Sequence, residues 1–170
     1  EKTLGNCFSL QIVVSVILTA VLLIWNKDLL LAFGASENTI GYATDYMSIY
    51  AIGTLFVQMT LGMNTFITAQ GFTTISMVSV IIGAVCNIVL DPIFIFGFQM
   101  GVKGAALATI ISQMLSCVWI ISFLCGRKTL LKLKKENLKL RADIILPCIA
   151  LGTAAFVMQS SESVISVCFN

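Results

Sequence analysis

Charged residues are scarce in this chain, and histidine is missing altogether. Only 11% of the 170 residues are charged, against about 25% in ordinary soluble domains. Hydrophobic residues make up 58% of the chain, and its mean hydropathy is +1.00. These values predict an integral membrane protein. Without histidine, the commonest metal ligand and general base, we expect neither a zinc enzyme nor a catalytic triad, and no other enzyme activity.

Two further motifs are missing. The six cysteines form no CxxC pair and lie mostly in apolar runs, which indicates small apolar side chains rather than a metal or redox site. No GxxxxGK[ST] loop is present, so any transport is expected to be driven by a gradient rather than by ATP. The chain starts without methionine and stops inside an apolar run. We expect it to be an internal piece of a longer protein.

Long apolar segments run through the whole sequence, which is not the pattern of a single signal peptide. The stretch between Asp45 and Asp91 holds 45 residues without a charge, too many for one crossing of about 20 residues. The polar, glycine-containing TAQGFTT (Thr68–Thr74) is the predicted turn within it. The five predicted transmembrane helices cover about residues 5–25, 40–67, 73–97, 102–125 and 144–170. We therefore predict an all-α, polytopic helix bundle.

Basic residues are concentrated in one connection. Seven of the ten lysines and arginines lie between Arg127 and Arg141, so the positive-inside rule predicts that this connection is cytoplasmic. Setting the topology is one role for these charges, and contact with anionic lipid is another. The TAQGFTT turn is then also inside, and the connections at 26–38 and 98–103 face outward. The stretch KDLLLAFGASEN (Lys27–Asn38) is predicted to be an interfacial end of the first helix.

A carboxylate interrupts the third apolar segment, in CNIVLDPIFIF. Placing a charge at the centre of a membrane helix costs at least ~2.5–3.5 kcal/mol, so such residues usually face a bundle interior or a cavity. Asn87 lies four residues before Asp91 and shares its helix face. Pro92 leaves one backbone carbonyl without its helical donor and favours a kink. By residue count, Asp91 and Thr109 both lie about 10 Å below the outer ends of their helices.

These oxygen atoms suit a small cation or a proton. Two other interpretations stay open for Asp91: it holds two helices together, or it is close enough to the outer interface to be solvated. Glu162, with Gln159 and neighbouring serines, lines either a cavity or a hydrogen-bonded packing seam. Tyr46 belongs to either an interfacial aromatic belt or a ligand-binding face. Gly53, Gly62, Gly83 and the sequence GVKGAALAT predict close helix packing.

Two longer motifs resemble a known family. NTFITAQG at 64–71 and CNIVLDPIFIFGFQMGVKGAALATIISQ at 86–113 are similar to the multidrug and toxic compound extrusion family of secondary transporters, and LGNCF and FVMQSSESVISVCFN also fit. The resemblance implies twelve helices in two six-helix lobes. Residues 1–125 then supply the third to sixth helices of the first lobe. Residues 126–142 form the cytoplasmic connection between lobes, and residues 143–170 start the second lobe.

The resemblance also implies a site and an activity. Asn87, Asp91 and Thr109 match the family's first-lobe cation site, which would bind Na+ if the protein is sodium-coupled. Tyr46 and Asn64 match polar residues of the first-lobe cavity, and Glu162 matches an acidic position of the seventh helix. We expect export of small-molecule drugs or organic cations in exchange for Na+ or H+, with Pro92 as a hinge.

No cofactor and no nucleic acid are expected. The expected partners are the lipid bilayer and the remaining helices of the same protein, and the expected location is a bacterial cytoplasmic membrane. Two other functions stay open. A flippase for lipid-linked precursors predicts basic patches lining the cavity, but no lysine or arginine lies within the predicted spans beyond Lys103 at the outer end of the fourth. A channel or membrane scaffold predicts that Asp91 is dispensable for every flux.

Overall fold

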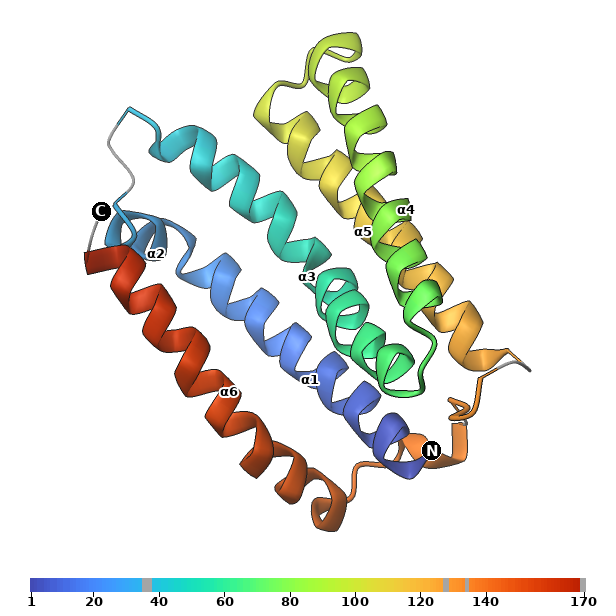
Figure 1. Cartoon of the computed structure of the whole chain (residues 1–170). Helices are drawn as coiled ribbons and strands as arrows, with labels where there is room; N and C mark the ends of the chain where they lie inside the picture. The colour runs from blue at the N-terminus through green and yellow to red at the C-terminus, as the bar shows by residue number, and fades with distance from the viewer. Residues whose placement is uncertain (35–37, 127–128, 134, 169–170) are drawn as a thin grey trace.

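The computed structural model describes residues 1–34, 38–126, 129–133 and 135–168, and within these residues the fold is all-helical (Figure 1). Five helices are long and apolar enough to cross a membrane, and they match the five predicted segments. The helices are α1 (Lys2–Ile24), α2 (Asn26–Ala32), α3 (Ile40–Ala69), α4 (Thr73–Pro92), α5 (Val102–Cys125) and α6 (Ala142–Cys168). A π-helix covers Ile93–Gly97, and a 3₁₀ helix covers Lys135–Leu138.

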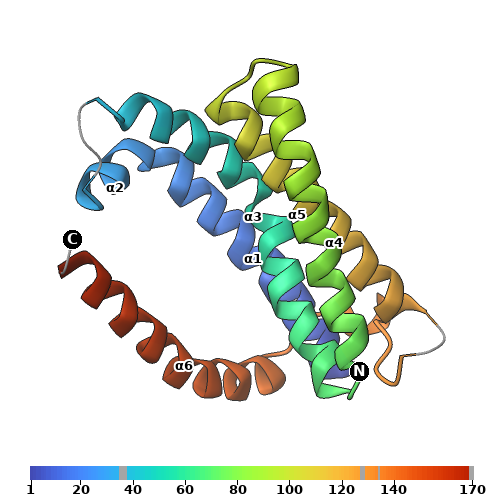
Figure 2. The same cartoon turned by 45° about the horizontal axis from the view of Figure 1, so that its top comes forward.

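Helix α3 is the centre of the bundle, because it packs against α1, α2, α4 and α5. Among the described elements α6 contacts α1 alone, and the turned view in Figure 2 shows it set apart from the other helices. We call the end of the bundle that carries the connection between α5 and α6 the basic end, and the other the opposite end. The predicted cytoplasmic side is the basic end.

The predicted turn between α3 and α4 lies where the sequence indicates it. Gly71 has φ +85°, a conformation that residues with a Cβ rarely adopt. The N–H of Gly71 donates to the carbonyl of Thr68 at 2.9 Å, and that of Phe72 donates to Ile67 at 3.2 Å. This pair of bonds is a Schellman motif, which ends α3 and turns the chain directly into α4.

The stretch after the first helix differs from its predicted form: α1 ends at Ile24, and the predicted interfacial end begins as a separate short helix, α2. Trp25 leaves the helical conformation with φ −103° and ψ 22°. The buried amide of Asn26 then donates to the Ser48 hydroxyl at 2.8 Å and to the Thr44 carbonyl at 3.3 Å. Asn26 thus fixes α2 to α3 at the opposite end, an arrangement that depends on tertiary contact and not on local sequence. Residues 35–37 of the predicted interfacial stretch lie outside the described residues.

The largest apolar cluster lies near the basic end. It joins the start of α1 to the last turns of α3 and α5 through Leu4, Met59, Met63, Ile67, Cys117, Ile120 and Leu124. All seven are 4% exposed or less. Helix α4 contributes none of these buried side chains and packs on the cluster through the partly buried Ile75, so its place in the bundle depends largely on other contacts.

Glycine residues allow α4 and the π-helix to pack closely against α5. A Cβ on Gly83 would lie 2.7 Å from the Ser116 hydroxyl of α5, and one on Gly104 would lie 2.8 Å from the Phe94 carbonyl carbon. The close approach that these glycines predict is therefore present.

The cysteines are free thiols among the described side chains, as predicted. Only Cys117 of these is buried: Cys7, Cys86 and Cys148 are half-buried, and Cys125 is exposed. The side chain of Cys168 lies outside the described residues.

Candidate functional site

The candidate site joins α4 to α5 toward the opposite end. Asn87 and Asp91 lie one turn apart on α4, and the Asn87 amide nitrogen is 3.1 Å from the nearer Asp91 carboxylate oxygen. The same nitrogen is 3.5 Å from the Thr109 hydroxyl of α5. Thr109 donates to the Ala105 carbonyl at 2.9 Å, so its lone pairs face the amide. The structure thus brings together all three residues that the sequence selected.

The charge at this site has little compensation within the chain. All three side chains are half-buried, and no described lysine or arginine forms an ion pair with Asp91. Its carboxylate accepts a hydrogen bond from the neutral amide of Asn87. A carboxylate in apolar surroundings is costly unless it is paired or protonated. The binding of a cation or proton at this site stays a prediction.

Pro92 is followed directly by an unusual backbone. The sequence predicts an α-helix as far as Gly97, but residues 93–97 form a π-helix. The N–H of Phe98 donates to Ile93 at 3.0 Å, and that of Met100 donates to Phe94 at 3.1 Å. Pro92 lacks the N–H that an α-helix needs, and single turns of π-helix are found often beside functional sites. The predicted kink thus takes the form of a widened turn, while the hinge role of Pro92 stays a prediction.

A cavity of about 280 Å³ lies beside the site, between α3, α4 and α5. Its polar lining comes from Asn87 and Thr109 together with Thr60, Ser112, Gln113 and Ser116, and Leu61 and Val80 are among its apolar walls. Because the site opens into this cavity, a ligand in the cavity can contact the residues that hold Asp91.

Buried serines extend the polar contacts toward the basic end, and sequence reasoning missed them. Ser116 donates to the Ser79 carbonyl at 2.7 Å, and the Ser79 hydroxyl is 3.2 Å from the side-chain oxygen of Asn64. Ser79 is fully buried and Ser116 is 1% exposed. Asn64 therefore lies on the same polar seam as the cavity. The only sign of this seam in the sequence is a serine within each of the two helices, since small polar residues are common where membrane helices pack.

Tyr46 lies nearer the opposite end, in a separate and mostly apolar pocket of about 480 Å³. It stacks on Tyr50 with ring centroids 5.8 Å apart and an interplanar angle of 15°. Tyr42 and Met47 of α3 and Leu30 of α2 also line this pocket. The structure thus gives Tyr46 a pocket wall, while its role as a ligand residue stays a prediction.

The structure does not bring Gln159 and Glu162 to the site. Both are exposed on α6, which contacts α1 but neither α4 nor α5 among the described residues. Ser161 and Ser163 return their hydroxyls to the carbonyls of Val157 and Gln159 in their own helix, at 2.8 and 3.1 Å. Any cavity role of this polar patch would require helices beyond this chain.

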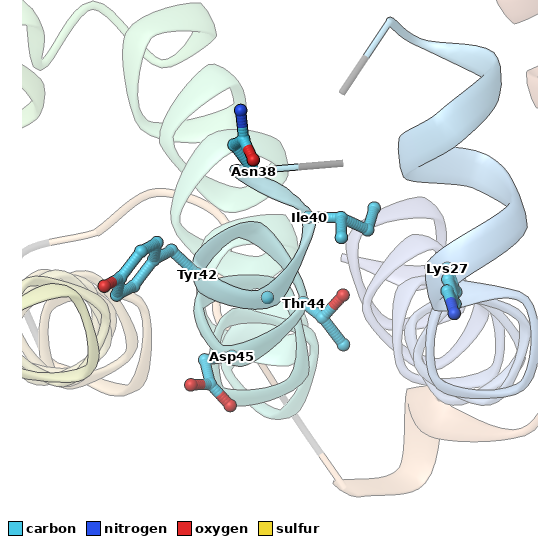
Figure 3. Close-up of a pocket in the computed structure, with 7 residues that line it drawn as sticks. Lys27, Asn38, Ile40, Tyr42, Thr44 and Asp45 are labelled. Carbon is cyan, nitrogen blue, oxygen red and sulfur yellow. The ribbon is translucent and has the colours of Figure 1, made fainter. Parts of the chain in front are cut away.

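A further pocket, of about 670 Å³, opens at the opposite end between α2 and α3. Ile40 and Thr44 extend from α3 toward the helix that carries Lys27 (Figure 3). Asp45, which also lines it, pairs with Lys103 of α5 at 3.3 Å, and both side chains are about half exposed. This ion pair links α3 to the start of α5 at the opposite end of the bundle.

The fold and the site define a multi-pass integral membrane protein with an intramembrane carboxylate beside a polar cavity. A family model for MatE matches residues 1–93. The chain therefore belongs to the MatE family, the one that its motifs resemble.

The relatives are bacterial, as predicted. The chain is 28% identical to the multidrug export protein MepA of Staphylococcus saprophyticus over 137 residues, which are 81% of this chain and 30% of the relative. It is 29% identical to MepA of Staphylococcus haemolyticus over 148 residues, or 87% of this chain and 33% of the relative. The chain thus spans about a third of the length of the curated relatives.

Solved transporter structures share the fold. A MATE structure in the straight conformation matches 96% of this chain and 37% of its own, with a TM-score of 0.86 and 24% identity. An outward-facing multidrug resistance MATE family transporter matches 85% of this chain and 32% of its own, with a TM-score of 0.78 and 25% identity. These likenesses confirm the predicted bundle.

Proposed function

We propose that this chain is part of a secondary transporter that exports small amphipathic compounds, often cations, in exchange for Na+ or H+. The observation that supports this most is the placement of Asp91, held by the amide of Asn87 beside Thr109, at the edge of a cavity. The bacterial relatives named as multidrug export proteins support the same class of substrate. Residues 1–125 would belong to the first lobe, and residues 143–170 would start the second.

The proposed cycle couples the charge of Asp91 to helix packing. A cation or proton that enters from the opposite end neutralises the carboxylate, with the oxygens of Asn87 and Thr109 as further ligands. A ligand shifts a conformational equilibrium only by its difference in affinity for the two states, so the ion must favour one packing of α4 on α5. The membrane potential adds about 2.3 kcal/mol per charge per 100 mV. The widened turn after Pro92 is where α4 would bend.

The substrate is proposed to share the cavity between α3, α4 and α5. Its volume of about 280 Å³ is enough for part of a drug-sized molecule. Thr60 and Gln113 offer hydrogen bonds, while Leu61 and Val80 offer apolar contact. A substrate in this cavity would compete with the ion for the groups around Asp91. Such competition is what the exchange of a substrate for an ion requires.

The test uses a full-length transporter that contains this sequence, in sealed vesicles loaded with a fluorescent cationic dye. Dye efflux is followed under an imposed Na+ gradient and, separately, under an imposed pH gradient. We expect efflux driven by one gradient, and a loss of that efflux in Asp91→Asn, which keeps the side-chain shape and removes the charge. Efflux that ignores both gradients, or that Asp91→Asn leaves intact, would contradict coupled exchange and favour a flippase, channel or scaffold.

A further inference from the structure

The connection between α5 and α6 is fastened to the bundle by one glutamine. Gln70 lies at the turn between α3 and α4, and its amide nitrogen donates to the Phe66 carbonyl at 3.0 Å. Its side-chain oxygen accepts three hydrogen bonds, from the N–H groups of Leu130 and Leu131 at 2.9 and 2.8 Å and from the hydroxyl of Thr129 at 2.8 Å. Thr129 is only 5% exposed. Gln70 therefore holds the start of the connection against the basic end.

A buried asparagine fastens the other end of the connection. Asn6 of α1 is 1% exposed, and its side-chain oxygen accepts a hydrogen bond from the Arg141 N–H at 2.7 Å. Its amide nitrogen is 3.4 Å from the Asn137 carbonyl. The Asn137 backbone also packs directly on Gly5, where a Cβ would collide with it. Ser9, one turn further along α1, donates to the Leu138 carbonyl at 2.6 Å.

These contacts make residues 129–133 and 135–141 part of the bundle, even though they lie between two membrane helices. Helix α6 begins directly after the last contact, and the N–H groups of Ile144 and Ile145 both donate to the Arg141 carbonyl, at 3.1 and 3.0 Å. Among the described elements α6 packs on α1 alone, and it joins the rest of the bundle through the connection that ends at Arg141. A rotation of α6 relative to the bundle would therefore pivot near Arg141.

We propose that Asn6 and Gln70 are positioning residues for transport, which clamp the connection onto the basic end and so fix the pivot of α6. This inference rests on the proposed function, because alternating access requires the helices after the connection to move relative to the bundle. A loose connection would let α6 shift without moving α3 and α4. Ion binding and helix movement would then be coupled less tightly.

Amide hydrogen exchange in a full-length transporter that contains this sequence tests the clamp. Gln70→Met removes the acceptor, so the amides of Leu130 and Leu131 should exchange about tenfold faster, because one hydrogen bond contributes on the order of RT ln 10. Gln70→Glu keeps acceptor oxygens and is the matched control, in which exchange should stay slow. Asn6→Ala should accelerate the Arg141 amide in the same way. Unchanged exchange at these amides would refute the clamp.

Transport measurements test whether Asn6 and Gln70 act as positioning residues or only stabilise the fold. In a full-length transporter containing this sequence, Gln70→Met and Asn6→Ala should lower the maximal efflux rate severalfold and leave the dye concentration at half-maximal rate unchanged. Gln70→Glu should restore the rate. Normal efflux in variants whose connection exchanges quickly would overturn the positioning role. If the parent protein transports nothing, the proposed function fails, while the exchange experiment still decides whether the clamp exists.

Discussion

Gly104 is the residue at which the packing of α5 on the π-helix can be tested most directly. It lies in the first turn of α5, is buried, and a Cβ there would lie 2.8 Å from both the carbonyl carbon and the oxygen of Phe94. Backbone atoms cannot move aside as a flexible side chain can, so Gly104→Ala forces the two segments apart. Overpacking costs about 1–3 kcal/mol, and the better helix propensity of alanine returns about 1 kcal/mol at most. We expect a net loss of about 1 kcal/mol in unfolding free energy.

The assay is thermal unfolding of the purified chain in detergent, followed by circular dichroism. A loss of 1 kcal/mol lowers the Tm of a chain of this size by about 2–4 °C. Gly152→Ala is the matched control, because Gly152 is exposed in α6 with nothing within 4 Å of its added Cβ, and its Tm should stay level or rise. A Tm for Gly104→Ala at or above that of the wild type would refute the close packing of α5 on the π-helix.

Two further predictions concern the site and α6. Thr109→Val removes the hydroxyl that faces the Asn87 amide and keeps the side-chain shape. The ion concentration for half-maximal dye efflux should then rise up to about tenfold, as expected for one lost polar contact. An unchanged ion concentration at half-maximal efflux would exclude Thr109 as a ligand. Cys7 of α1 and Cys148 of α6 are neighbours, so a mild oxidant should join them in a disulfide. Trypsin cleavage of the connection should then leave the two pieces linked on non-reducing gels, whereas Cys7→Ser should release them, and release from the wild type would contradict the α1–α6 contact.

The helices and the candidate trio could be predicted because their signals are local. Apolar length alone sets the membrane spans, and Gly71 readily adopts the positive φ that the turn requires. Asn87 and Asp91 share a face by helical spacing, and Thr109 follows from equal depth on the returning helix. Each of these inferences needs only one helix or one hairpin.

The features that the sequence did not predict depend on contacts between distant segments. Nothing near Gln70 in the sequence indicates that its partners are Leu130 and Leu131, about sixty residues away. Likewise, α2 exists as a separate helix because Asn26 bonds to α3, and a local pattern cannot show that bond. The polar patch around Glu162 looks like a site in the sequence, yet the described part of the chain holds no partner helix for it.

The position of the apolar cluster has a mechanical consequence. Its seven side chains hold α1, α3 and α5 together near the basic end, whereas the candidate site lies toward the opposite end. Thr109 lies eleven residues before Ile120, a lever arm of about 16 Å at 1.5 Å per residue. A tilt of ~10° about the cluster would therefore move the Thr109 hydroxyl by ~3 Å on this helical geometry. That displacement is enough to break its 3.5 Å contact with Asn87, so a small tilt at the basic end can separate the residues of the candidate site.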